Sequence, residues 1–246
     1  MKKRFKFDIF KYFGIFAIFI AWLLISMKAN NEVVMPSIRS TFSQLFNLLS
    51  LSSTYLVLLN SVGGLILIVI GSFLVALILA LISLKFESFK NFITPTLSLF
   101  KILPVPAVII LLLVQYSQSS IPYILTTMVV IPIVYEGIYG NLFSIDQDIK
   151  DEIKMITKPN LKVLINVYLP IIKIGILTTL LQSFGMGLKV KVMTEFIANS
   201  PKTIGYQLGY ARSILAMDQV FAWTIILVVI VIIIDSILGY LLSKSK

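Results

Sequence analysis

The feature that most constrains this chain is a series of six long apolar segments. Several of them approach or exceed the roughly 18–20 apolar residues that an α-helix needs to cross a bilayer. They do not alternate apolar and polar residues, as the strands of an outer-membrane barrel would. We therefore predict an all-α polytopic membrane protein with about six transmembrane helices, at residues 12–27, 55–84, 97–114, 121–139, 171–192 and 220–242.

Composition supports this class and excludes several others. Hydrophobic residues make up 58% of the sequence and the mean hydropathy is +0.99, whereas a soluble domain is nearer 45–50% apolar. The chain has no cysteine and no histidine. It therefore lacks disulfides, thiolate metal sites, the commonest metal ligand and every Ser/His/Asp arrangement. We expect no catalytic residue and no metal site.

The polar stretches divide the chain into three parts. Residues 1–30 form a basic N-terminal segment and the first span, residues 31–54 an amphipathic outer-side segment, and residues 55–242 the core with a loop at 144–170. The start resembles a signal peptide in layout, but no convincing A-x-A site precedes Lys28, so we interpret it as an uncleaved span.

Prolines and an apolar stripe predict local structure between these spans. Pro36 is expected at the first position of a short helix that lies along the membrane surface. Pro104 and Pro106 are expected to kink or break the third span. The apolar stripe of the surface helix is Ile38, Phe42, Leu45 and Leu49.

Basic residues assign the sides of the membrane. With six spans, both termini and the 144–170 loop fall on one side, which carries fourteen basic residues, whereas the other side carries four, namely Lys28, Arg39, Lys202 and Arg212. The positive-inside rule places the richer side in the cytoplasm. The net charge of +10 is thereby explained without nucleic acid. We expect a multi-pass protein of a bacterial plasma or inner membrane.

The 144–170 loop is the most polar stretch between two spans. Ser144 and Gln147 have the spacing of a capping box that opens a helix, and Pro159 is expected to end it. Asn160 can cap a second short helix, and Leu169-Pro170 predicts a further break. One apolar stripe follows the first helix, at Ile145, Ile149, Ile153 and Ile156. A helix this short needs a surface to lie on, either the protein's own inner face and lipid headgroups or a cytoplasmic partner.

The loop resembles the EAA motif of bacterial ABC-importer permeases, which reads E-A-A, three residues, G, nine residues, I-x-L-P. Asp151-Glu152-Ile153 stand at the E-A-A positions, Thr157 at the glycine, and Val167-Tyr168-Leu169-Pro170 at I-x-L-P. Both alanines and the glycine are replaced here. The resemblance implies that this loop is the coupling helix, which contacts the ATP-binding subunit through Asp151, Glu152, Ile153, Ile156, Thr157, Lys158, Leu169 and Pro170.

Further stretches resemble the nitrate/sulfonate/taurine-type permeases, in order, over roughly residues 34–240. They are Val34-Met35-Pro36-Ser37, Leu58-Leu59-Asn60-Ser61-Val62, Lys101-Ile102-Leu103-Pro104-Val105-Pro106-Ala107, Thr194-Glu195-Phe196 with Ile204-Gly205-Tyr206, and Val220-Phe221-Ala222 with Asp235. Gly64 departs from the arginine usual in that subfamily.

This resemblance implies the type I ABC importer permease fold and a set of partners. These are an ABC ATP-binding subunit, an extracytoplasmic substrate-binding protein or lipoprotein, and a second permease copy in a homodimer or heterodimer. The sequence has no G-x-x-x-x-G-K-[ST] loop, so this chain is expected to hold no cofactor, and ATP and Mg²⁺ are expected on the partner ATPase.

Polar residues on one face of the fifth span indicate a route for a solute. Thr178, Gln182, Gly185 and Lys189 recur at i, i+4, i+7 and i+11, and polar residues inside a span usually face protein or water. We predict that they line the translocation pathway together with Glu195. The alternative is that Thr178 and Gln182 bond a neighbouring helix and that Lys189 extends to the interface.

Lys191 and Glu195 are four residues apart and can pair, although Lys before Glu is the weaker order. On the outer side, Ser200-Pro201 can start another helix, in which Gly205 and Gly209 permit close packing.

Function follows as an ATP-driven importer subunit for a small solute. The solute is expected to be a small organic or inorganic anion of the sulfonate, taurine or nitrate kind, or a thiamine-precursor-like compound. A self-sufficient secondary transporter or channel is the alternative, although such a protein usually has an inverted repeat or intramembrane charges. A membrane enzyme is disfavoured by the absence of histidine and cysteine.

Overall fold

The chain folds into helices alone in the part that the structure describes. The computed structural model describes residues 9–156 and 161–244, and these contain no β-strand. Two of the helical segments are π-helical turns, η1 and η2. In order, the elements are α1 (Ile9–Ala29), α2 (Ile38–Ser50), α3 (Ser52–Leu58), η1 (Leu59–Gly63), α4 (Gly64–Lys85), α5 (Glu87–Ile102), α6 (Val105–Leu113), α7 (Ile121–Phe143), α8 (Gln147–Ile156), α9 (Leu161–Val163), η2 (Leu164–Tyr168), α10 (Leu169–Ile171), α11 (Lys173–Ile197), α12 (Ile204–Ser213) and α13 (Met217–Lys244).

Five of the six predicted membrane spans correspond to helices, or bent helix pairs, of membrane-crossing length and apolarity. Three qualify among the described residues, namely Ser52–Lys85, Ile121–Phe143 and Met217–Lys244, and bent pairs raise the number to five. The bent pairs are Glu87–Ile102 with Val105–Leu113 and Leu164–Ile171 with Lys173–Ile197. The first predicted span corresponds to a shorter apolar helix, Phe16–Ala29 within α1.

The break in the third span is sharper than a kink. Helices α5 and α6 meet at 92°, because Leu103 precedes Pro104 and takes an extended conformation, with ψ of 130°. Pro106 then lies in the first turn of α6, where a missing N–H costs nothing. Helix α5 also begins at Glu87, ten residues before the predicted start of the third span.

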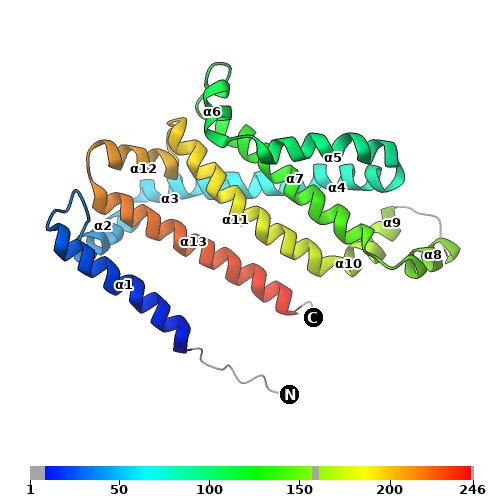
Figure 1. Cartoon of the computed structure of the whole chain (residues 1–246), viewed down its shortest axis with the longest axis horizontal. Helices are drawn as coiled ribbons and strands as arrows, with labels where there is room; N and C mark the ends of the chain where they lie inside the picture. Colours follow the sequence, from blue (N-terminus) through cyan, green and yellow to red (C-terminus); the bar gives the residue numbers. More distant parts are fainter. Residues whose placement is uncertain (1–8, 157–160, 245–246) are drawn as a thin grey trace.

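The core is a layer of three helices, α4, α7 and α11, with α7 between the other two (Figure 1). Helices α7 and α11 approach closely at two glycines. A Cβ on Gly137 would lie 2.8 Å from the Thr179 Cβ, and one on Gly175 would overlap the Asn141 side chain. Small residues of this kind let helices in lipid pack through their backbones.

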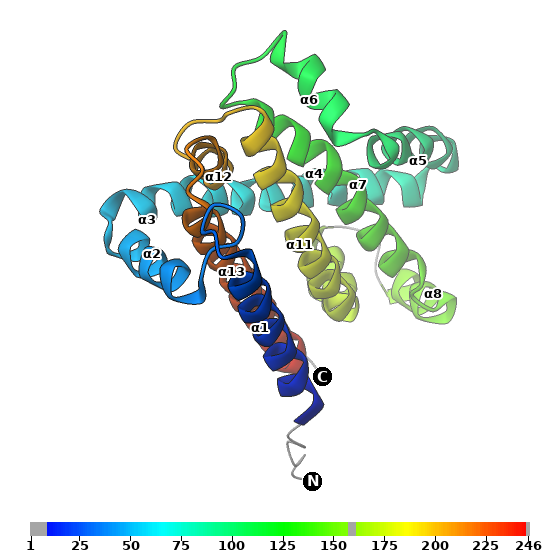
Figure 2. The ribbon, with the colours of Figure 1, turned by 60° about the vertical axis from the view of Figure 1, so that its left-hand side comes forward.

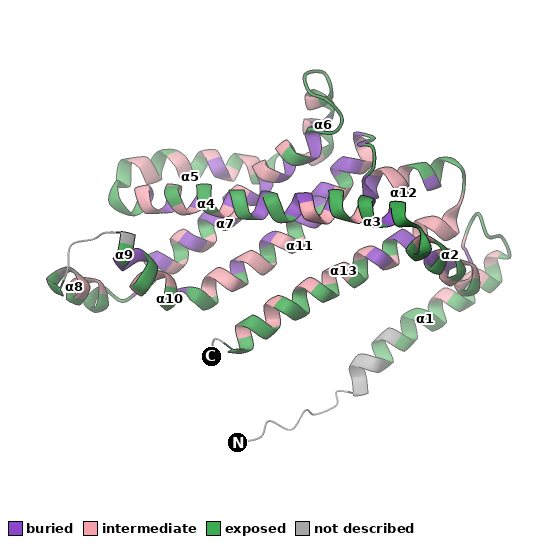
Figure 3. Cartoon of the chain, turned by 180° about the vertical axis from the view of Figure 1, so that it is seen from behind, coloured by how far each residue is buried: buried purple, intermediate pink, exposed green. Residues whose placement is uncertain are grey.

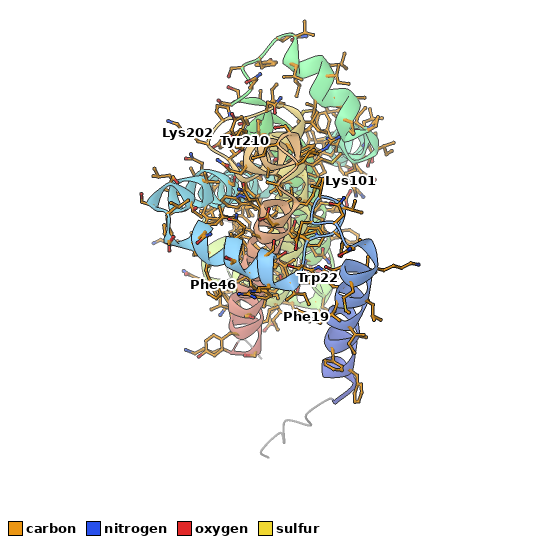
Figure 4. The ribbon with its side chains drawn as sticks, turned by 90° about the vertical axis from the view of Figure 1, so that its left-hand side faces the viewer. Phe19, Trp22, Phe46, Lys101, Lys202 and Tyr210 are labelled. Carbon is orange, nitrogen blue, oxygen red and sulfur yellow. The ribbon has the colours of Figure 1, made fainter. Side chains whose placement is uncertain are left out.

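Helix α13 lies outside this core and leaves most of its surface uncovered. Only 6% of its most apolar stretch is buried, against 56% for α7 (Figure 3). It packs on α2 and α12, and Leu45 of α2 is buried against Trp223 and Ile226 of α13. The predicted surface helix therefore turns its stripe partly toward another helix of the chain, while Phe46 stays exposed (Figure 4).

Helix α1 touches the rest of the chain near its end. Trp22 donates its indole N–H to the Pro36 carbonyl oxygen at 3.0 Å and packs on Phe221, with ring centroids 5.4 Å apart (Figure 4). The prediction that Pro36 opens α2 is wrong. Ser37 is the N-cap, because its hydroxyl accepts the Ser40 amide hydrogen at 3.1 Å. The Ser37 amide in turn donates to Glu32 at 2.9 Å and lowers the pKa of that carboxyl.

Helices α12 and α8 lie toward opposite ends of the molecule (Figure 2). The end of α13 and the start of α1 both lie away from α12 (Figures 1 and 2). The long helices therefore run from the part of the molecule built by α2, α3 and α12 toward the part that carries α8 and the end of α13.

The close approach of α7 and α11 is testable with two glycines of the same helix. Gly137→Ala should lower the free energy of unfolding by about 1–3 kcal/mol, because the stiff, β-branched Thr179 side chain cannot move out of the way. Nothing lies within 4 Å of a Cβ on Gly140, so Gly140→Ala should be neutral or slightly stabilising. Thermal unfolding in detergent measures both, and equal melting temperatures would contradict this packing.

Candidate functional site

Helix α8 presents an uncovered apolar surface at one end of the molecule. Its stripe divides into two parts, since Ile145 just before the helix is buried whereas Ile149 is 41% and Ile156 77% exposed. Met155 beside it is 87% exposed. The stripe predicted from the sequence therefore exists. No other described part of the chain covers its distal part.

The start of α8 differs from the predicted capping box. Asp146 caps the helix, because its carboxylate accepts the Asp148 amide hydrogen at 3.2 Å and its carbonyl oxygen accepts that of Lys150. Ser144 instead ends α7 and donates its hydroxyl to the Asn141 carbonyl oxygen at 3.0 Å. The reason is that Ser144 still has helical φ and ψ, whereas an N-cap leaves the helical region.

The residues predicted for coupling lie in two places. Asp151, Glu152, Ile153 and Ile156 belong to α8, and Glu152 and Ile156 are exposed. Thr157, Lys158, Pro159 and Asn160 lie outside the described residues. Leu169 and Pro170 belong to α10.

Pro170 does not interrupt the helical conformation. It occupies the first turn of α10, where proline is tolerated. The chain turns two residues later, at Ile172, and the segment Leu164–Ile171 meets α11 at 71°. The sequence therefore located the break to within one helical turn.

An aromatic column along α7 connects α8 to the core. Tyr135, Tyr139 and Phe143 stack with successive centroids 5.8 Å apart. At the inner end Lys150 donates to the Phe143 carbonyl oxygen at 2.9 Å, and at the other end the Tyr135 hydroxyl donates to Ser83 at 2.9 Å. The sequence reading missed this column, although its i, i+4, i+8 spacing could have indicated it.

Helix α11 has two chemically different faces. Thr178, Gln182 and Lys189 are exposed and Gly185 is half-buried, so four residues predicted for the pathway do share one face. The Thr178 hydroxyl donates to the Ile174 carbonyl oxygen of its own helix at 2.9 Å, not to a neighbouring helix. The opposite face, with Thr179, Ser183 and Gly187, is buried against α7 and α4.

A groove of about 770 Å³ lies between α11, α12 and α13. Lys189 lines it from α11 and Arg212 from α12, and apolar side chains line most of the rest. Thr178 and Gln182 lie on the same face of α11 but are not part of this lining. The groove therefore meets only the outer part of the predicted pathway face.

Glu195, the fifth predicted pathway residue, is in a different environment. It is fully buried and forms an ion pair with Lys191, which is also fully buried. The sequence indicated that these two residues can pair, but it did not indicate that the pair is buried. Its burial in the core arises because α12 and the turn η1 close over it.

The ion pair is surrounded by polar partners from three other elements. Glu195 accepts hydrogen bonds from the Ser61 hydroxyl of η1 at 2.8 Å and from the Gly205 amide of α12 at 3.2 Å. The Lys191 ammonium donates to the Asn60 carbonyl oxygen at 3.3 Å and lies 4.9 Å from the centroid of the Tyr123 ring of α7. A charge in low dielectric persists only when it is satisfied in this way.

Two further hydrogen bonds tie η1 to the start of α12 and to the turn just before it. The Ile204 amide donates to the Ser61 hydroxyl oxygen at 2.9 Å, and the Asn60 side-chain amide donates to the Lys202 carbonyl oxygen at 3.0 Å. Gly205 is required for this contact, because a Cβ there would overlap Glu195 and the backbone of Phe196. We call Asn60, Ser61, Lys191, Glu195 and Gly205 the polar node.

The polar node predicts a large effect from removing one charge. Glu195→Gln leaves the Lys191 ammonium buried and unpaired, and it should lower the free energy of unfolding by about 3–5 kcal/mol. Adding Lys191→Met should restore much of that loss, because the unpaired charge is then gone. Thermal unfolding of both variants in detergent checks this, and a double variant no more stable than Glu195→Gln would argue against a paired charge.

Comparison with known proteins adds one match. A family model described as "Binding-protein-dependent transport system inner membrane component" matches residues 72–246, which is more than half of the chain. No curated protein matches the chain.

Proposed function

The chain belongs to the family of binding-protein-dependent transport system inner membrane components, and on this premise we propose how its parts divide the work of import. Members are permease subunits with the type I importer fold and not catalytic subunits. Membership implies an ATP-binding subunit and a substrate-binding protein as partners. We propose an importer of the nitrate/sulfonate/taurine type in a bacterial cell membrane.

Helix α8 is the docking site for the ATP-binding subunit in this proposal. The observation that carries it is the exposure of Met155 and Ile156, at 87% and 77%, on a helix that also carries charged residues. Removing the apolar surface of such side chains from water stabilises the complex by about 25 cal/mol for each Å² buried. A groove on the ATPase would cover them, while Asp151, Glu152 and Ile153 contact its rim.

The sides of the membrane follow from charge. Helix α8, the start of α1 and the end of α13 all lie away from α12 (Figure 2), and the positive-inside rule assigns the basic residues of these segments to the cytoplasm. Both termini are then cytoplasmic, and α12 faces the binding protein outside. ATP and Mg²⁺ belong to the partner ATPase, and this chain holds neither.

Transport proceeds by alternating access between two states of the spans. ATP closes the partner subunits and moves α8. Lys150 and the aromatic column pass that motion to α7, which packs against both α4 and α11. Hydrolysis returns the spans to their first state.

The exposed face of α11 lines the path of the solute. Thr178, Gln182, Gly185 and Lys189 contribute from that face, and a second permease copy, identical or related, closes the path from the other side. Glu195 acts from behind the path, because it holds α11 to α12. The solute is a small organic or inorganic anion, which Lys189 would attract, or a thiamine-precursor-like compound.

Docking through α8 predicts a selective loss of partner binding. Ile156→Asp and Met155→Asp should abolish co-purification of the ATP-binding subunit, because each places a charge in an apolar contact. Membrane insertion should be unchanged. The measurement is co-expression with candidate ATP-binding subunits followed by affinity purification in detergent.

Tyr116→Asp provides the matched control for this experiment. Tyr116 is also a large exposed side chain, at 49%, but it lies between α6 and α7, away from α8. It should retain the ATPase. Failure of the unchanged chain to bind any ATPase would favour a self-sufficient transporter or channel, and loss of insertion in the α8 variants would contradict a docking role.

The proposed path along α11 can be mapped by labelling introduced cysteines. The native sequence contains no cysteine, so it gives no background signal. Single cysteines at Thr178 and Gln182 should react with a membrane-impermeant thiol reagent in the assembled transporter, because that face is wet. Cysteines at Thr179 and Ser183, one position along on the buried face, should stay unreactive. Labelling followed by mass spectrometry measures this, and equal protection of all four positions would mean that the exposed face meets lipid.

A further inference from the structure

Three hollows follow one another along α11 and α13. The outermost, of about 390 Å³, lies around Arg212 and Met217, and both residues also line the main groove of about 770 Å³. The groove shares Leu188 and Val231 with a third, much smaller hollow, which is lined by Gly185 and Asp235. The shared lining residues join the α12 end of the molecule to the middle of the pathway face.

Charged residues are placed unevenly along this series. Lys189 and Arg212 reach the main groove from two different helices, and its lining contains no carboxylate. Both side chains are exposed, and among the described residues neither has a carboxylate within ion-pair distance. An acidic residue occurs only in the third hollow, where Asp235 lies on the far side of Leu188 from Arg212.

Most of the groove between these two cations is apolar. Its walls include Val192, Met193, Phe196 and Leu227, and its volume lies within the roughly 300–1,000 Å³ of pockets that hold small organic ligands. An inorganic anion would leave these walls uncovered. An uncharged apolar molecule would leave both cations without an anionic partner.

We infer that the groove is the binding site for a solute that combines one anionic group with an apolar body, and that Arg212 is its principal anion ligand. This inference rests on the proposed function, because it takes the α11 face as the route of import. The guanidinium is planar and can hold an oxyanion with two parallel hydrogen bonds, while Lys189 supplies a second point charge. Asp235 repels an anion, so the solute stops between the two cations.

The full chain in nanodiscs of zwitterionic phosphatidylcholine is the material for the test, with empty nanodiscs as the blank. Three probes separate the contributions of charge and apolar surface. Naphthalene-2-sulfonate has both the anion and the body, sulfate has the anion alone, and naphthalen-2-ylmethylammonium has a similar body with the opposite charge. Isothermal titration measures each, and only naphthalene-2-sulfonate should bind.

Variants assign the anion to its ligands. Arg212→Gln and Lys189→Gln should each weaken sulfonate binding about tenfold or more, as the loss of one charged hydrogen bond predicts. Arg212→Lys should recover part of the loss for Arg212. Lys202→Gln is the matched control, because Lys202 lies near α12 (Figure 4) and its side chain is exposed outside the groove.

Each contrary outcome overturns a defined part of the inference. Equal binding of the sulfonate and the ammonium would show that charge plays no part in binding. Absence of binding by all three probes would mean that lipid or a second permease copy fills the groove. If sulfate bound as tightly as naphthalene-2-sulfonate, the apolar body of the solute would contribute nothing to binding. Co-purification of the ATPase with Arg212→Gln is the independent readout. If the unchanged chain retains the ATPase but does not bind naphthalene-2-sulfonate, only this inference fails, whereas absence of any ATPase partner contradicts the proposed function itself.

Discussion

The arrangement of the α12 end depends on one buried ion pair. Lys191 and Glu195 are both removed from solvent, and two charges in a low-dielectric interior are stable only if every remaining polar atom finds a partner. Those partners come from η1, α12 and α7. Segments more than a hundred residues apart in sequence are thereby held in one register. Gly205 completes the arrangement, because any side chain there would separate α12 from the backbone of α11.

The same helix that carries this pair also carries the exposed face proposed to line the pathway. Behind α11, small and hydroxyl residues such as Thr179, Ser183 and Gly187 let α7 and α4 pack closely and leave the hydroxyls bonded to their own helix. In front, α11 is free to line a groove with α12 and α13. In the proposed function, the closely packed face holds α11 in place and the open face guides the solute while neighbouring helices move. At the opposite end, the aromatic column gives α8 a direct contact with α7.

Particular residues show how far the sequence alone could predict this structure. Five of the six spans were predictable because apolar length is a local property, and the exposed face of α11 and the Lys191–Glu195 pair followed from helical periodicity. Element ends were less accurate. Asp146 rather than Ser144 caps α8, and Ile172 rather than Pro170 carries the bend. In each case several residues were chemically able to take the role, and packing of the flanking helices selected one.

The sequence by itself determined the class of the protein, its spans, the polar loop with its apolar stripe and the positions of its charges. These depend on composition and on the 3.6-residue period, which need no knowledge of neighbours. Only the tertiary structure decided that Glu195 is enclosed by Ser61 and Gly205, and that Arg212 and Lys189 meet at one groove. Those contacts join segments that are distant in the sequence. The sequence alone could not predict them, because the burial of a charge depends on which helices close over it.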